Sequence, residues 1–356
     1  MIFTSIVVIL VSFIISLTIT PFLRQFIIRF GIFDAPEKSR KIHDSPKPTS
    51  GGLAIYVAFI VPIMIVFFIN YSSFAGSIWF PRIIGLLFTS TLILIVGFVD
   101  DVRGMEPIKK LFFQVLASIL IYYCGFKIKL FTNPFGETVQ LGFLGLPITI
   151  VWIVGITNAI NLVDGIDGLA TGVVLFASIT IYSISICMGN PVSTVLIAAI
   201  LGACAGFLKY NFYPATIFMG DTGSQFLGFL IGVVSIGACQ KSSLAVALLT
   251  PVIVLGLPIM ETLLSVGRRV KNSSSPFQAD MDHVHHRLLS RGYSQRQTVY
   301  ILYMICVILG IIGFIFTAAR SIFAAGLLAV LAILLLLGTV YFGYFQKLHN
   351  KNAEPK

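Results

Sequence analysis

Long apolar segments alternate along this chain with short polar ones. Most apolar segments hold about 20 residues, the length that an α-helix needs to cross the hydrocarbon core of a bilayer. The pattern therefore predicts an all-α integral membrane protein. We expect about eleven transmembrane helices, near residues 2–20, 51–69, 82–99, 111–126, 146–161, 170–188, 192–208, 224–239, 243–266, 298–317 and 321–345.

The composition excludes a soluble protein of this size. Hydrophobic residues make up 57% of the chain and charged residues 11%, with a mean hydropathy of +0.97. No soluble domain or long linker interrupts the pattern, so residues 1–356 form a single polytopic membrane domain. The five cysteines lie inside predicted spans without a CxxC pair, as is typical of apolar packing residues.

The basic residues predict the orientation in the membrane, because Lys and Arg of short loops stay on the cytoplasmic side. With the N-terminus outside and the C-terminus in the cytoplasm, 19 of the 24 basic residues face inward. Of the 14 carboxylates, which did not enter this choice, only Glu137 lies outside. This distribution predicts a multi-pass protein of the inner (cytoplasmic) membrane whose site faces the cytoplasm. The net charge of +10 suits anionic lipids and substrates and requires no nucleic acid.

Two segments depart from the simple helical pattern. Residues 126–145 contain alternating apolar positions on either side of Asn133-Pro134-Phe135-Gly136, which favours a small external β-hairpin. The span at 243–266 contains Pro251 and Pro258, so we expect a kink or break there, near the acidic Glu261.

The polar residues of the inner side fall into clusters. The first lies before the second span, and the second lies at the end of the third span. The stretch Lys38 to Gly52 is a basic segment typical of lipid-phosphate anchoring, although its proline and glycine turn could also hold Lys41 and His43 at a phosphate. Asp100 and Asp101 end the third span, where two carboxylates oppose each other and the helix dipole unless a Mg²⁺ ion or a proton relieves them.

A third cluster occupies residues 158–172. Asn158, Asn161 and Asp164 are spaced by three and share one helix stripe, and glycines then allow a tight turn that brings Asp167 back toward Asp164. Such amides and carboxylates suit a cation with oxygen ligands or the polar edge of a nucleotide. Amide contacts between helices are the alternative, and they explain Asn158 better than the two aspartates.

The last two clusters lie at residues 209–228 and 268–299. In the first, Asp221 begins a helix, so we expect backbone N–H groups to cradle phosphate oxygens while Asp221 holds a metal; a plain helix cap at Ser224 is the alternative. The second contains His283, His285 and His286. Their spacing does not match the usual zinc pair, and their position beside an arginine favours pyrophosphate binding.

Taken together, four ordered motifs resemble the bacterial polyprenyl-phosphate N-acetylhexosamine-1-phosphate transferase superfamily, within glycosyltransferase family 4. They are DD at 100–101, NAINLVDGIDGL, NFYPATIFMGDTGS and the DxxHVHHRLL loop. The resemblance covers about residues 20–298, which makes this stretch the catalytic region and leaves 299–356 for the last two spans and the tail. It implies an enzyme of cell-envelope glycopolymer synthesis, such as that of teichoic acid or O-antigen.

The resemblance also implies roles for individual residues. Asp221, with Asp164, would bind Mg²⁺, with Mn²⁺ as an alternative, Asp100 would deprotonate the lipid phosphate, and Asp101 would assist. Substrate binding would fall to Lys41, His43, Lys110, Asn158, Asn161, Asp164, Asp167, Asn211, Arg268, Arg269, His283, His285 and His286.

The implied reaction moves N-acetylglucosamine 1-phosphate from UDP-N-acetylglucosamine to undecaprenyl phosphate and releases UMP. Phosphoryl transfer depends mainly on alignment and charge neutralisation, which aspartates, a metal and histidines supply. The turn at 47–52 is intermediate between two branches of the superfamily, so a phospho-N-acetylmuramoyl-pentapeptide transferase is the alternative. A transporter of anionic solutes is a remote alternative, because its ion sites would lie near the bilayer midplane. The sequence leaves a homodimer open.

Overall fold

The computed structural model describes residues 1–34, 47–74, 76–128, 130–132, 138–238, 246–271 and 283–318. Within them, α-helices dominate, because a chain in lipid must satisfy its backbone hydrogen bonds within each segment. Seven stretches are long and apolar enough to cross a membrane. They comprise α1 (Ile2–Arg29), α2 (Gly52–Ile69), α4 (Trp79–Arg103), α6 (Gly145–Val163) with the turn before it, α7 (Leu169–Cys187), α8 (Pro191–Asn211) and α13 (Gln295–Ala318). The chain is a multi-pass membrane protein.

Two further helices coincide with predicted spans but differ from the seven. The helix α5 (Pro107–Tyr123) has 17 residues, at the lower limit of a spanning length. The helix α9 (Gly220–Ala238) begins with polar residues, and these reduce its mean hydropathy. The predicted span at 321–345 lies outside the described residues. The number of eleven spans and their orientation therefore stay predictions.

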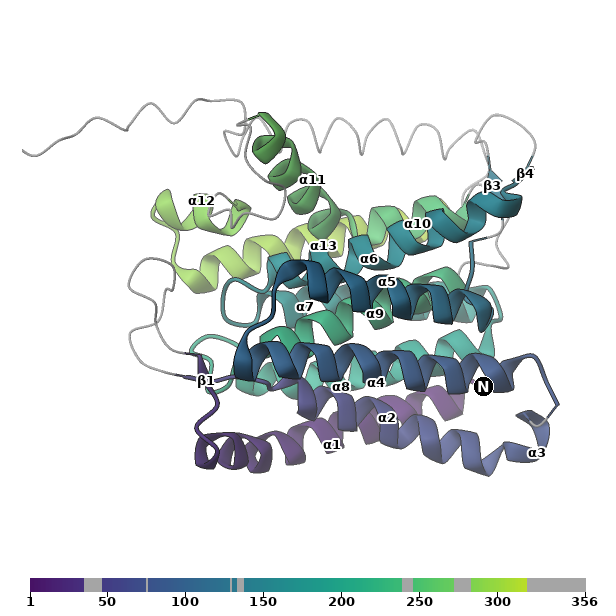
Figure 1. The fold of residues 1–356 in the computed structure, drawn as a ribbon, viewed down its shortest axis with the longest axis horizontal. Coiled ribbons are helices and arrows are strands. Elements are labelled where there is room, and N and C mark those ends of the chain that lie inside the picture. The colour runs from purple at the N-terminus through teal and green to yellow at the C-terminus, as the bar shows by residue number, and fades with distance from the viewer. Residues whose placement is uncertain are drawn as a thin grey trace, which may run out of the picture.

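The predicted break in the span at 243–266 is confirmed. The chain forms α10 (Val246–Val254) and then α11 (Gly256–Lys271), with a turn at Leu255 between them. Pro258 explains the position of this break, because it has no N–H group to donate to the carbonyl of Val254, four residues earlier. Figure 1 shows that α11 leaves the common direction of the other long helices.

Short elements occupy the two ends of the helix bundle (Figure 1). At one end, β1 (Phe33–Asp34) pairs antiparallel with β2 (Lys47–Pro48), and α12 (Val284–Ser290) lies on the same side. At the other end, β3 (Leu130–Thr132) pairs antiparallel with β4 (Thr138–Gln140), which confirms the predicted hairpin. The remaining short helices are α3 (Tyr71–Phe74) and the 3-10 turn η1 (Gly142–Leu144).

The centre of the bundle is α9. Every residue from Thr222 to Ala238 is buried, and α2, α4, α6, α7 and α8 all pack against this helix. Glycines permit the closest approaches: a Cβ at Gly228 would lie 2.7 Å from the Cα of Thr157 on α6. The first turn of α9 consequently meets the ends of several helices, and the polar clusters gather there.

Candidate active site

Asp101, in the last turn of α4, holds the beginning of α9. Its carboxylate accepts hydrogen bonds from the backbone N–H groups of Asp221 (2.8 Å) and Thr222 (3.2 Å) and from the Thr222 hydroxyl (2.5 Å). The first N–H groups of a helix have no partner within the helix and attract negative charge. Asp101 therefore supplies a cap from another helix, and these two amides are already used. This differs from the expectation that they cradle phosphate.

The turn before α2 packs directly on the same place. Ser50 donates its hydroxyl hydrogen to Asp101 (2.9 Å), and the N–H groups of Gly51 and Gly52 donate to the carbonyls of Phe218 and Met219. A Cβ at Gly52 would lie 2.6 Å from the carbonyl carbon of Thr222, so only glycine permits this contact. The predicted tight turn is thus present, whereas Lys41 and His43 lie outside the described residues.

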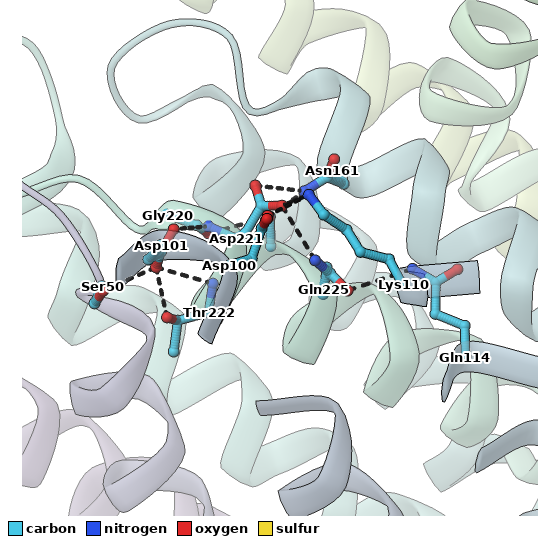
Figure 2. Close-up of polar contacts among 11 residues, drawn as sticks. Ser50, Asp100, Asp101, Lys110, Gln114, Asn161, Gly220, Asp221, Thr222 and Gln225 are labelled. Carbon is cyan, nitrogen blue, oxygen red and sulfur yellow. Dashed lines mark hydrogen bonds and ion pairs between the residues drawn. The ribbon is translucent and has the colours of Figure 1, made fainter. Parts of the chain in front are cut away.

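Asp100 and Asp221 converge on Lys110, which lies in the first turn of α5 (Figure 2). The Lys110 ammonium forms ion pairs with both carboxylates, at 2.7 Å from Oδ2 of Asp221. Asn161 donates from its amide nitrogen to Oδ1 of Asp221 (3.0 Å) and to the Ser224 hydroxyl (2.9 Å). Because the side chains of Asp100, Lys110 and Asp221 keep 11%, 23% and 28% exposure, a ligand can reach this group.

This group matches the chemistry of a magnesium site in part. No three Asp, Glu, His or Cys side chains among the described residues are placed to hold a metal by themselves. Mg²⁺ is usually bound by one or two carboxylates, with water and substrate phosphates completing its shell. Asp221 and Asp100 are two partly exposed carboxylates that already bind one cationic group, Lys110. Their oxygens are therefore suitable ligands for such an ion.

Asp167, in the turn after α6, connects two other segments of the site. Its Oδ2 accepts from the backbone N–H of Ala215 (2.8 Å) and pairs with the Lys47 ammonium (3.3 Å). The same ammonium lies 5.0 Å from the centre of the Phe218 ring. Asp167 thus joins β2 to the 212–219 segment. Asp164 lies at the C-terminal cap of α6, three residues after Asn161.

Two predicted binding residues have partners inside the protein. The amide nitrogen of Asn158 donates to Oε1 of Gln114 (2.7 Å) on α5, so this residue joins two helices. Asn211 is buried, accepts from the Thr171 hydroxyl (2.7 Å) and donates to the carbonyl of Ile217 (3.1 Å). Their roles in substrate binding stay predictions.

The histidines are held by Glu261 of α11. One oxygen of this buried carboxylate accepts from the backbone N–H of Val284 (2.9 Å) at the start of α12, and the other lies 3.4 Å from Nδ1 of His283. The rings of His283 and His285 are stacked with centres 5.5 Å apart, and the ring of His286 lies 4.4 Å from that of His285. Glu261 thereby attaches α12 to α11. The helix α11 also carries Arg268 and Arg269, which are half-buried.

His285 connects this helix to the turn after α6. A Cβ at Gly165 would lie 2.5 Å from its Nε2, so the glycine leaves room for the imidazole. Burial, together with the neighbouring His286 and His283, holds the pKa of His285 well below its ordinary value. The ring is neutral at neutral pH. On the opposite side of the turn, Tyr303 of α13 donates to the carbonyl of Gly168 (2.6 Å).

The structure thus brings together Asp100, Asp101, Lys110, Asn161 and Asp221, and it places the histidines beside the Asp164–Gly168 turn. Sequence reasoning missed several residues of this region, namely Ser50, Gln114, Gln225 and Tyr303. A signal existed for Gln114 and Gln225, because an amide inside an apolar span requires a partner.

Comparison with known proteins identifies the family of this chain. Residues 83–238 match the model of glycosyl transferase family 4, and this stretch contains Asp100, Lys110, Asn161 and Asp221. The chain is also 36% identical over 314 residues to the probable undecaprenyl-phosphate N-acetylglucosaminyl 1-phosphate transferase of Bacillus subtilis, across 87% of this chain and 83% of the relative. The chain belongs to glycosyl transferase family 4.

Two other similar proteins also act, by their names, as phosphotransferases or transferases of sugars. The decaprenyl-phosphate N-acetylglucosaminephosphotransferase of Mycolicibacterium smegmatis is 32% identical, across 88% of this chain and 81% of the relative. The phospho-N-acetylmuramoyl-pentapeptide-transferase of Clostridium novyi is 30% identical, across 86% of this chain and 95% of the relative. The relatives thus include enzymes named for two different sugars, and the greatest identity among these three is to an N-acetylglucosamine enzyme.

Proposed function

We propose that this protein transfers N-acetylglucosamine 1-phosphate from UDP-N-acetylglucosamine to undecaprenyl phosphate. The products are undecaprenyl-pyrophosphoryl-N-acetylglucosamine, a first lipid-linked intermediate for a cell-envelope glycopolymer, and UMP. The observation that carries the proposal is the convergence of Asp100, Lys110, Asn161 and Asp221 at one end of a membrane-embedded bundle. The 36% identity to a relative named for this acceptor and sugar supports the choice of substrates.

The reaction exchanges one phosphoanhydride for another. An oxygen of the lipid phosphate bonds to the sugar-bearing phosphorus, and the bond from that phosphorus to the UMP oxygen breaks, so no further energy source is required. Such transfers depend on alignment and on neutralising the charge of the phosphates. Lys110 is already held between two carboxylates and can contribute a positive charge to this neutralisation.

Asp100 and Asp221 take different parts in this proposal. Asp100 removes the proton of the lipid phosphate, since its carboxylate is partly exposed beside Lys110. Asp221 would hold Mg²⁺ together with substrate oxygens, and the ion when bound would neutralise the pyrophosphate. Asn161 keeps Oδ1 of Asp221 in place through its amide.

The histidine side of the site serves the donor nucleotide in this proposal. His283 and His286 lie beside the neutral, buried His285, on a helix that Glu261 fixes. We assign them to the pyrophosphate, because imidazoles next to arginine can donate to phosphate oxygens. In this proposal the protein lies in the inner (cytoplasmic) membrane and its site faces the cytoplasm. The presence of 19 of the 24 basic residues in the predicted inner loops supports this orientation.

The test measures UMP release by the purified full chain with Mg²⁺, undecaprenyl phosphate and either UDP-N-acetylglucosamine or UDP-N-acetylmuramoyl-pentapeptide. We expect UMP with the first nucleotide and none after Asp221→Asn or after EDTA treatment. The matched control is Ser235→Ala on the same helix, because that hydroxyl donates to the Gly232 carbonyl and lies near the far end of α9. UMP only with the pentapeptide nucleotide would contradict the sugar assignment, and activity in EDTA would contradict the metal assignment.

A further inference from the structure

Three amides, two of them buried and one half-buried, lie behind Asp221, on the side of the helix bundle. Gln114 belongs to α5, Asn158 to α6 and Gln225 to α9, and the two glutamines are only 2% and 1% exposed. Burying an amide in an apolar environment costs free energy unless each of its polar atoms finds a partner. Three helices that each contribute such an amide at one place therefore need a reason beyond packing.

The amides form one chain of hydrogen bonds with a single direction. Asn158 donates to Oε1 of Gln114 (2.7 Å), Gln114 donates to Oε1 of Gln225 (3.4 Å), and Gln225 donates to Oδ2 of Asp221 (3.1 Å). Figure 2 shows its last two steps, with both glutamines directed along the line toward Asp221. Each glutamine uses its oxygen to accept from the previous residue and its nitrogen to donate to the next.

Both ends of the chain determine this direction. At its start, the Asn158 nitrogen also donates to the carbonyl of Val154 (2.8 Å), which can only accept. At its end, an ionised carboxylate can likewise only accept. If Gln225 were reversed, its oxygen would face Oδ2 of Asp221 and its nitrogen would face the nitrogen of Gln114. The orientation of Gln225 is thus set by Asp221 itself and also by Gln114 and Asn158, which do not bond to Asp221.

We propose that Gln225, Gln114 and Asn158 are positioning residues that set the carboxylate of Asp221 for the Mg²⁺–nucleotide. Oδ2 is held by Gln225 and Lys110 and Oδ1 by Asn161, so the plane of the carboxylate cannot rotate freely. Aligned amides also polarise one another, and this strengthens the final bond to the anion. The inference rests on the proposed function in naming the nucleotide and in taking Asp221 as the Mg²⁺ ligand.

The experiment uses Mn²⁺ as a probe, because its binding to the purified chain can be measured by electron paramagnetic resonance without any substrate. Gln225→Leu removes the last donor at nearly the same volume. We expect Mn²⁺ binding to weaken by about 10-fold, as is usual when a residue that orients a metal ligand is lost. In turnover, kcat and the Mg²⁺ requirement change, whereas KM for undecaprenyl phosphate does not. Gln114→Leu, one step further away, weakens Mn²⁺ binding in the same direction by less.

The controls separate positioning from general damage. Thr157→Val on α6 and Ser235→Ala on α9 alter buried hydroxyls that donate to the Ile153 and Gly232 carbonyls, on two of the three helices that carry the amides. We expect both variants to bind Mn²⁺ like the wild type. In an Asp221→Asn background, Gln225→Leu should cause no further loss of Mn²⁺ binding. If Gln225→Leu does not fold, Gln114→Leu, which leaves Gln225 intact, is used instead. It is then compared with the two control variants and tested in the Asp221→Asn background.

Three results would overturn the proposal: a folded Gln225→Leu or Gln114→Leu protein with wild-type Mn²⁺ binding, an equal loss in the two control variants, or Mn²⁺ binding that does not depend on Asp221. Failure of the proposed function looks different. In that case neither UDP-sugar yields UMP with the wild-type chain, while the effects of the glutamine variants on Mn²⁺ binding persist.

Discussion

Asp100 and Asp101 are neighbours in the sequence, but their contacts separate them at the residue scale. Asp100 reaches Lys110 and remains accessible, whereas Asp101 accepts four hydrogen bonds from Ser50, the Asp221 and Thr222 amides and the Thr222 hydroxyl. A carboxylate with that many donors is committed to holding the structure. We therefore infer that Asp100 serves the chemistry and that Asp101 keeps Asp221 in position.

This division predicts different effects for two similar substitutions. Asp101→Asn presents an NH₂ group to donors that need an acceptor, so it should lower both UMP release and the free energy of unfolding, the latter by about 1–3 kcal/mol. Asp100→Asn should lower UMP release with little change in stability. Thermal unfolding in detergent, recorded beside the activity of both variants, checks this. A stable Asp101→Asn protein together with an unstable Asp100→Asn protein would reverse the assignment.

At the scale of elements, two helices of the site are capped by a carboxylate from a different helix. Asp101 of α4 caps α9, which carries Asp221, and Glu261 of α11 caps α12, which carries the histidines. The helix α12 depends on its cap more than α9 does. It has only seven residues, and such a short helix is marginally stable alone. The break at Leu255 begins the separate helix that bears Glu261.

We expect Glu261→Ala and Glu261→Gln to differ. Glutamine retains an oxygen that accepts from Val284, whereas alanine leaves that N–H without its partner and releases α12 from α11. Glu261→Ala should therefore accelerate trypsin cleavage after Arg287 and Arg291 and raise KM for the UDP-sugar, while Glu261→Gln stays nearer the wild type in cleavage. Thr262→Val, which alters a hydroxyl bonded to the Pro258 carbonyl on the same helix, is the control. Equal cleavage of all three variants would show that Glu261 does not hold α12.

At the scale of the whole molecule, the bundle has one end rich in titratable contacts and another formed by the β3–β4 hairpin. The contacts of Asp101 with α9, of Asp167 with β2 and of His285 with Gly165 all lie at the first end, although these segments are far apart in the sequence. At the other end, Asn190 donates to the carbonyl of Gly237. Among the described residues, the carboxylates of Asp100, Asp101, Asp167, Asp221 and Glu261 thus make their contacts at one end of the bundle.

This arrangement, with the positive-inside rule, predicts that the loop containing Glu106 is cytoplasmic and that Asn70 is external. Both positions are exposed and suit single cysteines in a background without the five natural ones. A membrane-impermeant maleimide should label Asn70→Cys in intact cells and Glu106→Cys only in inverted vesicles. The opposite labelling would mean that the site faces outward.

Much of the fold could be predicted, because its determinants are local in the sequence. Apolar runs of spanning length indicated helices, Pro258 indicated the break before α11, and the turn residues at 133–136 indicated the hairpin. The grouping of Asp100, Asn161 and Asp221 could also be anticipated, since each lies at the same end of its predicted span. These features depend on length, on turn chemistry and on the cost of polar groups in lipid.

The sequence alone thus determined the membrane class, most helices and the types of side chain at the site. Only the tertiary structure decided what those side chains do to one another: that Asp101 caps α9, that Asn158 donates to Gln114, and that Glu261 docks α12. The physical reason is that a hydrogen bond between helices depends on their rotation and depth against each other. Packing of the whole bundle sets both quantities, and the residues within any one helix do not.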